Sequence, residues 1–397
     1  MSLHIAYVVG QSTGGLPHYT AELANAVSKH AEVTVLKPDE TTADDMFDDR
    51  VEVIDAFKPI SVSMPQLYSF DVNPLDFVRG IRSYDNLKLL DEVDPDIVHD
   101  PSDLFPQMKL YAARHNVGER WPFVVTRHEV VVDRFSLSRP PVFAEEMLLA
   151  VLPDVYESQY IVHSGKQKEA LATHGIDSDI IDVIPHGAYE VFGTHEDVDV
   201  DVDSNSLLFF GHIVPPKGLD TLAAAIPLVK REVPDVKLLV AGEGNLPRKL
   251  KQLQKDHPEN VEVHNYYLPN DEVKNLFGRA KIVVAPYRSQ GGTKGHSGAV
   301  STAFSFGKPV VASTAGEFRE QVQESGAGTV VPPEDPEKLA EALVDVLQND
   351  EKRASMGENS LKMAERLSWE SIAERHLGLY ERLAERQRAT HSPAASK

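Results

Sequence analysis

The chain has 397 residues, a length that predicts two domains of about 150 to 200 residues, and its 42% hydrophobic and 25% charged content is typical of a globular protein. Asp and Glu outnumber Lys and Arg by 61 to 40, and the formal charge of -21 argues against a general affinity for nucleic acid or anionic membranes. The absence of cysteine excludes disulfides, thiolate metal sites and a cysteine nucleophile, and no apolar run reaches the ~20 residues of a membrane-spanning helix.

The N-terminus predicts a cytoplasmic protein. Its first residues, MSLHIAYVVG, lack the basic start and the cleavage site of a signal peptide, and their apolar run is typical of a buried first strand. The acidic composition has two interpretations. One is that it provides solubility. The other is that the protein comes from a halophilic source, where salt at 1 M shortens the range of repulsion between the acidic groups to about 3 Å.

The first half of the chain predicts a parallel sheet covered by helices. Apolar residues recur at helical spacing over 19–30, directly after the first expected strand. Short β-branched runs, typical of buried parallel strands, occupy residues 4–9, 32–37, 96–100, 123–128 and 160–164. This alternation predicts an α/β fold with a doubly wound sheet.

An acidic linker interrupts the alternation at 190–205, where EVFGTHEDVDVDVDSN has too many carboxylates for a buried strand. The pattern then restarts, with strands expected at 206–212, 236–242, 261–267, 281–287, 308–313 and 328–333. Besides this linker, the sequence predicts an N-terminal domain over 1–189 and a C-terminal domain over 206–367. It also predicts a last helix over 368–391, which crosses back to the N-terminal domain, and a tail at 392–397.

Glycine-rich turns that follow a strand mark the expected ligand sites, because doubly wound sheets bind ligands at the carboxyl ends of their strands. In GQSTGGLPHYTAEL, at 10–23, Gly14 and Gly15 permit close approach to the backbone, and the following helix start offers N–H groups to an anion. A simple tight turn is the alternative. The same stretch matches the GxSxG elbow of serine hydrolases with Ser12 as nucleophile, but only nine residues precede it, which disfavours that interpretation.

Two similar turns occur in the second half. The segment 209–230 places Lys217 in the first turn of a helix, where a cation opposes the helix dipole unless an anion such as a diphosphate lies nearby. A solvated lysine is the alternative. The segment 286–313 carries several glycines ahead of a helix that is expected to begin near Ser297, a second helix start suited to phosphate.

The order and spacing of six segments resemble the family-4 retaining glycosyltransferases. These segments are GGLPHYTAELA (14–24), IPHG (184–187), FFGHIVPPKGLDTL (209–222), the stretch from SG to GKPVVAS (297–313), VPPEDPEKLAEAL (331–343) and SWESIAERHLGLYERL (368–383). The resemblance implies a GT-B fold, in which two Rossmann-like domains face a central cleft. It also implies that the acceptor binds mainly to the N-terminal domain and the nucleotide sugar mainly to the C-terminal one.

The same resemblance implies an enzyme of the hexosyltransferase type that needs no bound metal or other cofactor. It transfers a sugar, with retention of configuration, from a nucleotide diphosphate sugar to a glycan, lipid-linked or small-molecule acceptor. Lys217 neutralises the leaving diphosphate, and His128 is the active-site histidine near the transferred sugar. The donor phosphates are contacted by glycine-loop and helix-start residues, namely Gly14, Gly15, Ser297 and Gly298.

Two departures from the family pattern concern the donor site. His212 stands where many members have an arginine five residues before the lysine, so this phosphate contact is weakened or becomes dependent on pH. Lys294 and Thr302 replace a frequent pair of glutamates, and a subgroup with Ser-Gly in place of that pair is the most similar. The identity of the donor stays open. The alternatives to a glycosyltransferase are a catalytically silent nucleotide-sugar-binding protein and a GT-B sugar-nucleotide epimerase.

Two charged stretches have competing interpretations. The stretch 109–139 contains six basic and three acidic residues. It is either an ordinary mixed surface or a surface that contacts an anionic acceptor or the inner face of a membrane. The aspartates at 197, 199, 201 and 203 begin like a calcium loop, but the glycine and the final glutamate of that loop are missing. A solvated linker is the better interpretation, and we expect no metal site.

Overall fold

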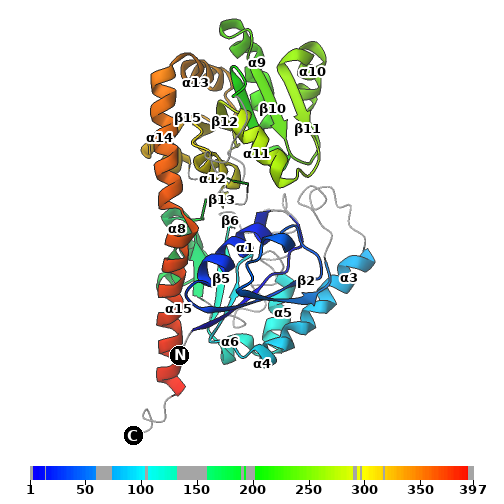
Figure 1. The fold of residues 1–397 in the computed structure, drawn as a ribbon, viewed down its shortest axis with the longest axis vertical. Coiled ribbons are helices and arrows are strands. Elements are labelled where there is room, and N and C mark those ends of the chain that lie inside the picture. The colour runs from blue at the N-terminus through cyan, green and yellow to red at the C-terminus, as the bar shows by residue number, and fades with distance from the viewer. Residues whose placement is uncertain are drawn as a thin grey trace. The chain divides into compact units, whose positions relative to one another are not determined.

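The computed structural model describes residues 3–13, 15–59, 74–102, 106–131, 159–188, 192–193, 202–288, 293–295, 297–315 and 318–391. The chain divides into two compact units, each with its own parallel sheet (Figure 1). Unit 1 contains Met1–Gly187, Thr293–Gly295 and Trp369–Lys397, and unit 2 contains Ala188–Gly292 and His296–Ser368.

Unit 1 is built on a seven-stranded sheet with the order β3-β2-β1-β4-β5-β7-β8, and its strand pairs are all parallel. The strands are β1 (His4–Val8), β2 (Glu32–Pro38), β3 (Val51–Phe57), β4 (Ile97–Asp100), β5 (Phe123–Arg127), β7 (Gln159–Val162) and β8 (Ile181–Val183). The central strands β4, β5 and β7 are buried throughout, as expected where helices cover both faces of a sheet. A short antiparallel ribbon pairs β6 (Glu129–Val131) with β13 (Thr293–Gly295).

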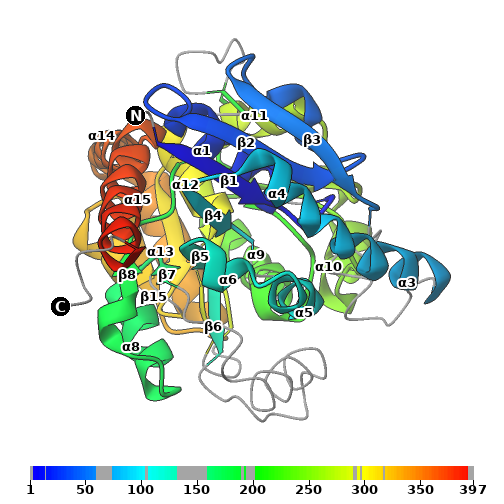
Figure 2. The same cartoon turned by 90° about the horizontal axis from the view of Figure 1, so that it is seen from below.

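The helices of unit 1 include a C-terminal one that follows unit 2 in sequence. They are α1 (Gly15–Val27), α3 (Pro74–Ser83), α4 (Leu90–Val93), α5 (Pro106–Arg114), α6 (Val117–Arg120), α8 (Gly165–Thr173) and α15 (Trp369–His391). Both views show α15 alongside α1 (Figure 1 and Figure 2). Glu370 of α15 pairs with Lys29 at 2.8 Å and with His30 at 2.9 Å, so the start of α15 is attached to the segment that follows α1.

Unit 2 has a six-stranded sheet with the order β11-β10-β9-β12-β14-β15, again with parallel pairs. Its strands are β9 (Ser206–Phe210), β10 (Lys237–Ala241), β11 (Val261–His264), β12 (Ile282–Ala285), β14 (Val310–Ser313) and β15 (Gly328–Val331). Its helices are α9 (Leu219–Glu232), α10 (Arg248–Asp256), α11 (Asn270–Arg279), α12 (Gly298–Ser305), α13 (Pro336–Gln348) and α14 (Asp350–Arg366).

Capping residues explain why α13 and α14 are separate helices although only Asn349 lies between them. The Asp335 carboxylate accepts from the Lys338 N–H at 2.9 Å and starts α13, and the Asn349 side chain accepts from the Lys352 N–H at 2.9 Å and starts α14. A side chain that accepts from the third helical N–H satisfies a group that the helix itself leaves unpaired. A second break separates α14 from α15 at Leu367 and Ser368, where the sequence predicts one.

Each sheet has one point at which the strand order reverses, between β1 and β4 in unit 1 and between β9 and β12 in unit 2. In doubly wound sheets the ligand binds at this point, outside the carboxyl ends of the strands. The segments that leave these strands carry the residues expected to bind the donor. Each unit therefore contains one candidate ligand-binding region, at the carboxyl ends of its central strands.

Candidate functional site

In unit 2, Lys217 and Tyr287 meet at the carboxyl ends of β9 and β12. Lys217 ends a short 3-10 helix, Pro215–Lys217, and Tyr287 lies two residues beyond β12. The Lys217 Nζ donates to Tyr287 Oη at 2.6 Å and lies 4.0 Å from the centroid of the same ring. Within the described part of the chain this ammonium has no carboxylate partner. A cation supported by an aromatic ring keeps its charge for an anionic ligand.

Ser297 joins this pair through the same tyrosine hydroxyl. Its Oγ lies 2.7 Å from Tyr287 Oη, and the residue is only 1% exposed. Ser297 precedes α12, yet its side chain makes no capping hydrogen bond, because its hydroxyl faces Tyr287 instead. The first N–H groups of α12, beginning with that of Gly298, are therefore left without a side-chain cap, which suits an anion.

His212 adds little positive charge to this site at neutral pH. Burial, and then the nearby charge of Lys217, lower its pKa below the ordinary value of 6.5. A neutral imidazole can exchange hydrogen bonds with a phosphate but does not neutralise it. His212 therefore does not supply the charge that an arginine at this position would carry.

Sequence patterns did not single out Tyr287 or Arg288. Arg288 pairs with Asp220 of α9, and its backbone N–H donates to the Pro216 carbonyl at 2.8 Å. The segment after β12 is thus tied to the segment after β9. The available signal was positional, since Tyr287 ends the predicted strand 281–287 and Arg288 follows it, but no glycine or charge pattern distinguishes them.

Gly218 lets these two segments approach closely. Its φ is +70°, and a Cβ built on it would lie 1.9 Å from the carbonyl oxygen of Pro286. That position requires glycine both for its left-handed backbone and for the space. The contact sets the position of Lys217 relative to Tyr287.

In unit 1, α1 begins at Gly15 directly after the glycine-rich turn, and Gly14 lies outside the described residues. No acidic side chain lies in the first turn of α1, so its N–H groups and dipole stay favourable for an anion. Tyr19, one turn further along, packs edge-on against His128 with ring centroids 4.7 Å apart. The structure therefore brings Gly15 and His128 to the same edge of the sheet.

His128 follows β5, and both of its ring nitrogens lie within hydrogen-bond distance of protein atoms. Its Nε2 lies 2.9 Å from the Pro101 carbonyl oxygen, and its Nδ1 lies 3.1 Å from Nε2 of His163, which follows β7. His163 lies directly after β7, and the sequence did not indicate its contact with His128. Tyr19 and the ring of His186 pack against both histidines.

A second buried polar cluster underlies the first. His99 of β4 is fully buried between the Thr126 hydroxyl, 2.8 Å from its Nε2, and the Tyr380 hydroxyl of α15, 2.7 Å from its Nδ1. Tyr380 Oη also lies 3.2 Å from Tyr7 Oη. Burial lowers the pKa of His99 well below 6.5, so the cluster is neutral and structural at pH 7.

The basic stretch at 109–139 presents less free charge than its composition suggests. Lys109 and Arg127 are buried, Arg114 lies 3.4 Å from Asp85, and Arg120 pairs with Asp91. Arg134 and Arg139 lie outside the described residues. A membrane or acceptor contact through this stretch stays a prediction. No helix in the described ranges is both long enough and apolar enough to cross a bilayer.

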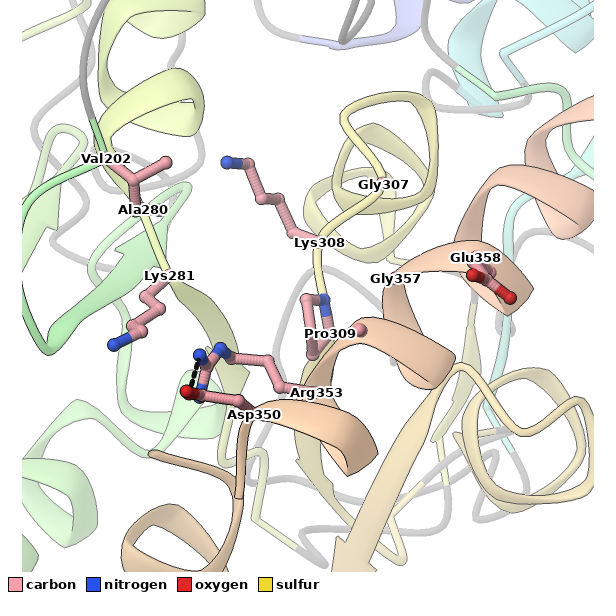
Figure 3. A pocket seen from close by; sticks show the side chains of 11 residues that line it. Val202, Ala280, Lys281, Gly307, Lys308, Pro309, Asp350, Arg353, Gly357 and Glu358 are labelled. Carbon is pink, nitrogen blue, oxygen red and sulfur yellow. Dashed lines mark hydrogen bonds and ion pairs between the residues drawn. The ribbon is translucent and has the colours of Figure 1, made fainter. Parts of the chain in front are cut away.

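A pocket of about 500 Å³ lies at the opposite end of the unit 2 sheet, beside the amino ends of β9, β12 and β14 (Figure 3). Figure 3 shows Lys281, Lys308 and Arg353 around it, with Arg353 paired to Asp350. Burial lowers the pKa of Lys308 to about 8, and its Nζ donates to the Gly278 carbonyl near the end of α11 at 3.0 Å. We assign Lys308 a structural role in capping α11, because the donor-type residues lie at the other end of the sheet.

Sequence models of two glycosyltransferase families match the two halves of the chain. The one described as Glycosyltransferase Family 4 matches residues 13–189, and the one described as Glycosyl transferases group 1 matches residues 204–349. The chain belongs to the family-4 glycosyltransferases. Its two Rossmann-like sheets are those of the GT-B fold, as the sequence predicts.

Named relatives and a solved structure are similar to the chain at different levels. A GDP-mannose-dependent monoacylated alpha-(1-6)-phosphatidylinositol monomannoside mannosyltransferase from Corynebacterium glutamicum is 34% identical over 41% of this chain and 43% of its own length, so less than half of that relative is matched. A phosphatidyl-myo-inositol mannosyltransferase from Mycobacterium leprae is 25% identical over 81% of this chain and 82% of its own. Sucrose-phosphate synthase from Thermosynechococcus elongatus shares the fold, with a TM-score of 0.71 at 18% identity, covering 96% of this chain and 99% of its own.

Thr302 and Lys294 stand where many family members have a pair of glutamates, and the structure shows the position of each. Thr302 is fully buried in α12, and its hydroxyl donates to the Gly298 carbonyl at 2.9 Å. It therefore cannot replace a glutamate that contacts a ligand. Lys294 lies in β13, where its backbone pairs with Val130. Within the described ranges no group of three or more His, Asp or Glu side chains could hold a metal ion.

Proposed function

We propose that this chain is a retaining glycosyltransferase that moves a sugar from a nucleotide diphosphate sugar to a hydroxyl acceptor. The observation that carries the proposal is the arrangement of Lys217, Tyr287 and Ser297 at the switch point of the unit 2 sheet. It combines a cation that no described carboxylate neutralises with an uncapped helix start, the two elements that stabilise a departing diphosphate.

The reaction breaks the bond between the anomeric carbon and the diphosphate oxygen, and the acceptor oxygen bonds to the same face of the sugar. The electron pair of the broken bond leaves with the diphosphate, where Lys217 and the first N–H groups of α12 stabilise it. The acceptor proton passes to the departing phosphate oxygen, which explains how the reaction proceeds without a separate general base. We assign the donor to unit 2 and the acceptor to unit 1.

GDP-mannose is the first donor to test, because the Corynebacterium relative is named as dependent on it. For the acceptor, the names of the matched mannosyltransferases favour an inositol phospholipid, which requires peripheral contact with the inner face of a membrane. A donor that binds unit 2 stabilises it by an amount that grows with the logarithm of concentration over the dissociation constant. Thermal shift with GDP-mannose, UDP-glucose and the free nucleotides therefore identifies the donor before any acceptor is known.

Replacing Lys217 tests the assignment directly. We expect Lys217→Ala to lower turnover of the identified donor by about 100- to 1000-fold, because one donor to a developing oxyanion contributes roughly 3 kcal/mol. Lys338→Ala is the matched control, since it removes the same charge from an exposed lysine that pairs with Glu341. Near-normal turnover in Lys217→Ala would contradict the proposal.

The missing glutamate pair favours one second candidate, a catalytically silent nucleotide-sugar-binding protein. The two functions differ in a product assay with radiolabelled donor. Binding that depends on Lys217, without transfer or hydrolysis of the sugar, would support the silent protein. Conversion of the donor to its epimer would instead identify an epimerase.

A further inference from the structure

Three hydrogen bonds follow one another through His128 and His163 in unit 1. His163 Nδ1 lies 3.0 Å from the Ile184 carbonyl oxygen, His163 Nε2 lies 3.1 Å from His128 Nδ1, and His128 Nε2 lies 2.9 Å from the Pro101 carbonyl oxygen. The two outer partners are carbonyl oxygens, which can only accept. All three distances are within the ordinary range for hydrogen bonds.

Gln167 of α8 holds the two histidine backbones in this arrangement. Its side-chain oxygen accepts from the His163 N–H at 2.6 Å, and its side-chain nitrogen donates to the His128 carbonyl at 3.0 Å. Gln167 is fully buried. Because these two partners fix which end of the amide faces which backbone, the histidine pair is a built feature of the fold.

Counting protons on the two rings gives an unexpected result. Each of the three contacts needs one ring proton, because each outer carbonyl must receive one and the contact between the rings needs one more. Two neutral imidazoles carry only one N–H each, so they supply two protons for three hydrogen bonds. Either one hydrogen bond is missing, or the pair carries an additional proton and a positive charge.

We propose that His128 and His163 share this additional proton at neutral pH, that it makes His128 an imidazolium, and that His163 is the positioning residue that keeps it there. His163 donates from Nδ1 to Ile184, which leaves its Nε2 as the acceptor for the Nδ1–H of His128. His128 then donates from both nitrogens, as only the charged ring can.

The surroundings favour His128 as the site of the charge. His163 is almost completely buried, and burial followed by the charge of His128 lowers its pKa well below 6.5. His128 is less buried than His163, so a charge on its ring costs less desolvation. Asp100, the buried carboxylate next to Pro101, accepts from Ser102 at 2.9 Å. The titratable groups on the elements around His128 include Tyr19, His99, Arg127, His186 and His376, together with His18 and Glu22 of α1 and Lys166, Lys168 and Glu169 of α8.

The consequence for the site rests on the proposed function. Both nitrogens of His128 already face protein acceptors, so the ring contributes charge rather than a hydrogen bond to the substrate. That charge adds to the positive end of α1, whose first turn contains no acidic residue. Unit 1 then offers a fixed positive potential for an anionic acceptor.

Nitrogen NMR of the histidine rings tests the protonation without any assumption about activity. In the full chain at pH 7.5 we expect one ring with both nitrogens protonated, and its signals are assigned by their loss in His128→Gln. In His163→Phe we expect the pKa of His128 to fall by at least about one unit, a tenfold change in its protonation equilibrium. In the matched control His186→Phe, which replaces a ring packed against the same pair, the charge should persist. A neutral His128 in the unmodified protein, or the same titration in His163→Phe, would overturn the proposal.

A pH profile of donor turnover links the charge to the site. His163→Phe is expected to lose about tenfold in kcat/KM at pH 7.5 and to regain activity toward pH 6, where His128 becomes protonated unaided. His163→Gln, whose side-chain oxygen can accept from His128, should restore part of the loss. A uniform loss across pH, with normal NMR titration, would refute the role of His163 in the reaction. Absence of any turnover in the unmodified protein would count against the proposed function alone, since the NMR result is independent of it.

Discussion

Replacing His376 by leucine is expected to make unit 1 less sensitive to acid. His376 lies in α15, fully buried, with its ring stacked on that of His99 at a centroid distance of 5.9 Å. Its Nδ1 donates to the Ile372 carbonyl at 2.8 Å, while its buried Nε2 has no hydrogen-bond partner in the described structure. An imidazolium there would have to bury a charge, and burial lowers the pKa of His376 from 6.5 to about 4.

The sign and size of the effect follow from that shift. Below pH 6.5 the unfolded chain binds a proton at His376 that the folded chain cannot take up until about pH 4. The stabilising contribution is therefore complete above pH 6.5 and decreases as the pH falls toward 4. At 1.36 kcal/mol per unit, the free energy of unfolding should decrease by about 2 kcal/mol between pH 7.5 and pH 5 because of this residue alone.

Urea unfolding followed by tryptophan fluorescence measures this for unit 1 specifically, because both tryptophans of the chain, Trp121 and Trp369, belong to it. His376→Leu should show a fall in unfolding free energy from pH 7.5 to pH 5 that is about 2 kcal/mol smaller than in the unmodified protein. His30→Leu, which removes an exposed histidine near the same helix, is the control and should keep the full fall. Equal falls in His376→Leu and in the unmodified protein would refute the burial argument.

Two further substitutions test the packing of unit 2, one beside the donor site and one at the opposite end of its sheet. Gly218→Ala should destabilise unit 2 by more than about 2 kcal/mol in urea unfolding followed by circular dichroism, because its Cβ would lie 1.9 Å from the Pro286 carbonyl oxygen. Gly175→Ala, with a φ of +88° but open space around it, should cost only about 1 kcal/mol, and equal costs would show that the contact is unimportant. Glu262→Gln should lower the unfolding free energy by about 2 kcal/mol, because Glu262 accepts from Arg279 twice at 2.8 Å. These bonds hold the pKa of Glu262 far below 4.5, so the deficit should persist from pH 8 to about pH 5 and shrink only below it, and its disappearance at pH 5 would contradict this assignment.

The sheets could be predicted from sequence to the extent that their strands are buried on both faces. The continuous apolar runs that form β9, β10 and β12 are of this kind. β3 was not predicted because it is an edge strand. Glu52 and Val53 are exposed, and the polar residues of the strand interrupt the continuous apolar run that marks a buried strand. β8 is an edge strand of three residues, too short to produce a pattern.

Residues of the candidate site were predictable where a local motif carries them. Lys217 and Gly15 stand in glycine-containing turns, and Ser297 precedes a helix, so their chemistry follows from a few neighbouring residues. Tyr287 supports the Lys217 ammonium from 70 positions away, and only the adjacency of β9 and β12 brings the two together. The same holds for His163, which meets His128 from 35 positions away because β5 and β7 are neighbours.

The C-terminal helix shows why such contacts determine the site as much as its motifs do. Tyr380 of α15 contacts Tyr7 of β1 and His99 of β4, the two strands between which the order of the unit 1 sheet reverses. These buried hydroxyl and imidazole groups would each cost free energy if left unpaired, so the observed register of α15 is favoured over a shifted one. The strands whose ends carry the glycine turn and the Pro101 carbonyl are thus aligned by a helix that comes last in the sequence. Because the Pro101 carbonyl is one of the acceptors of His128, the charge on that ring depends on the docking of α15.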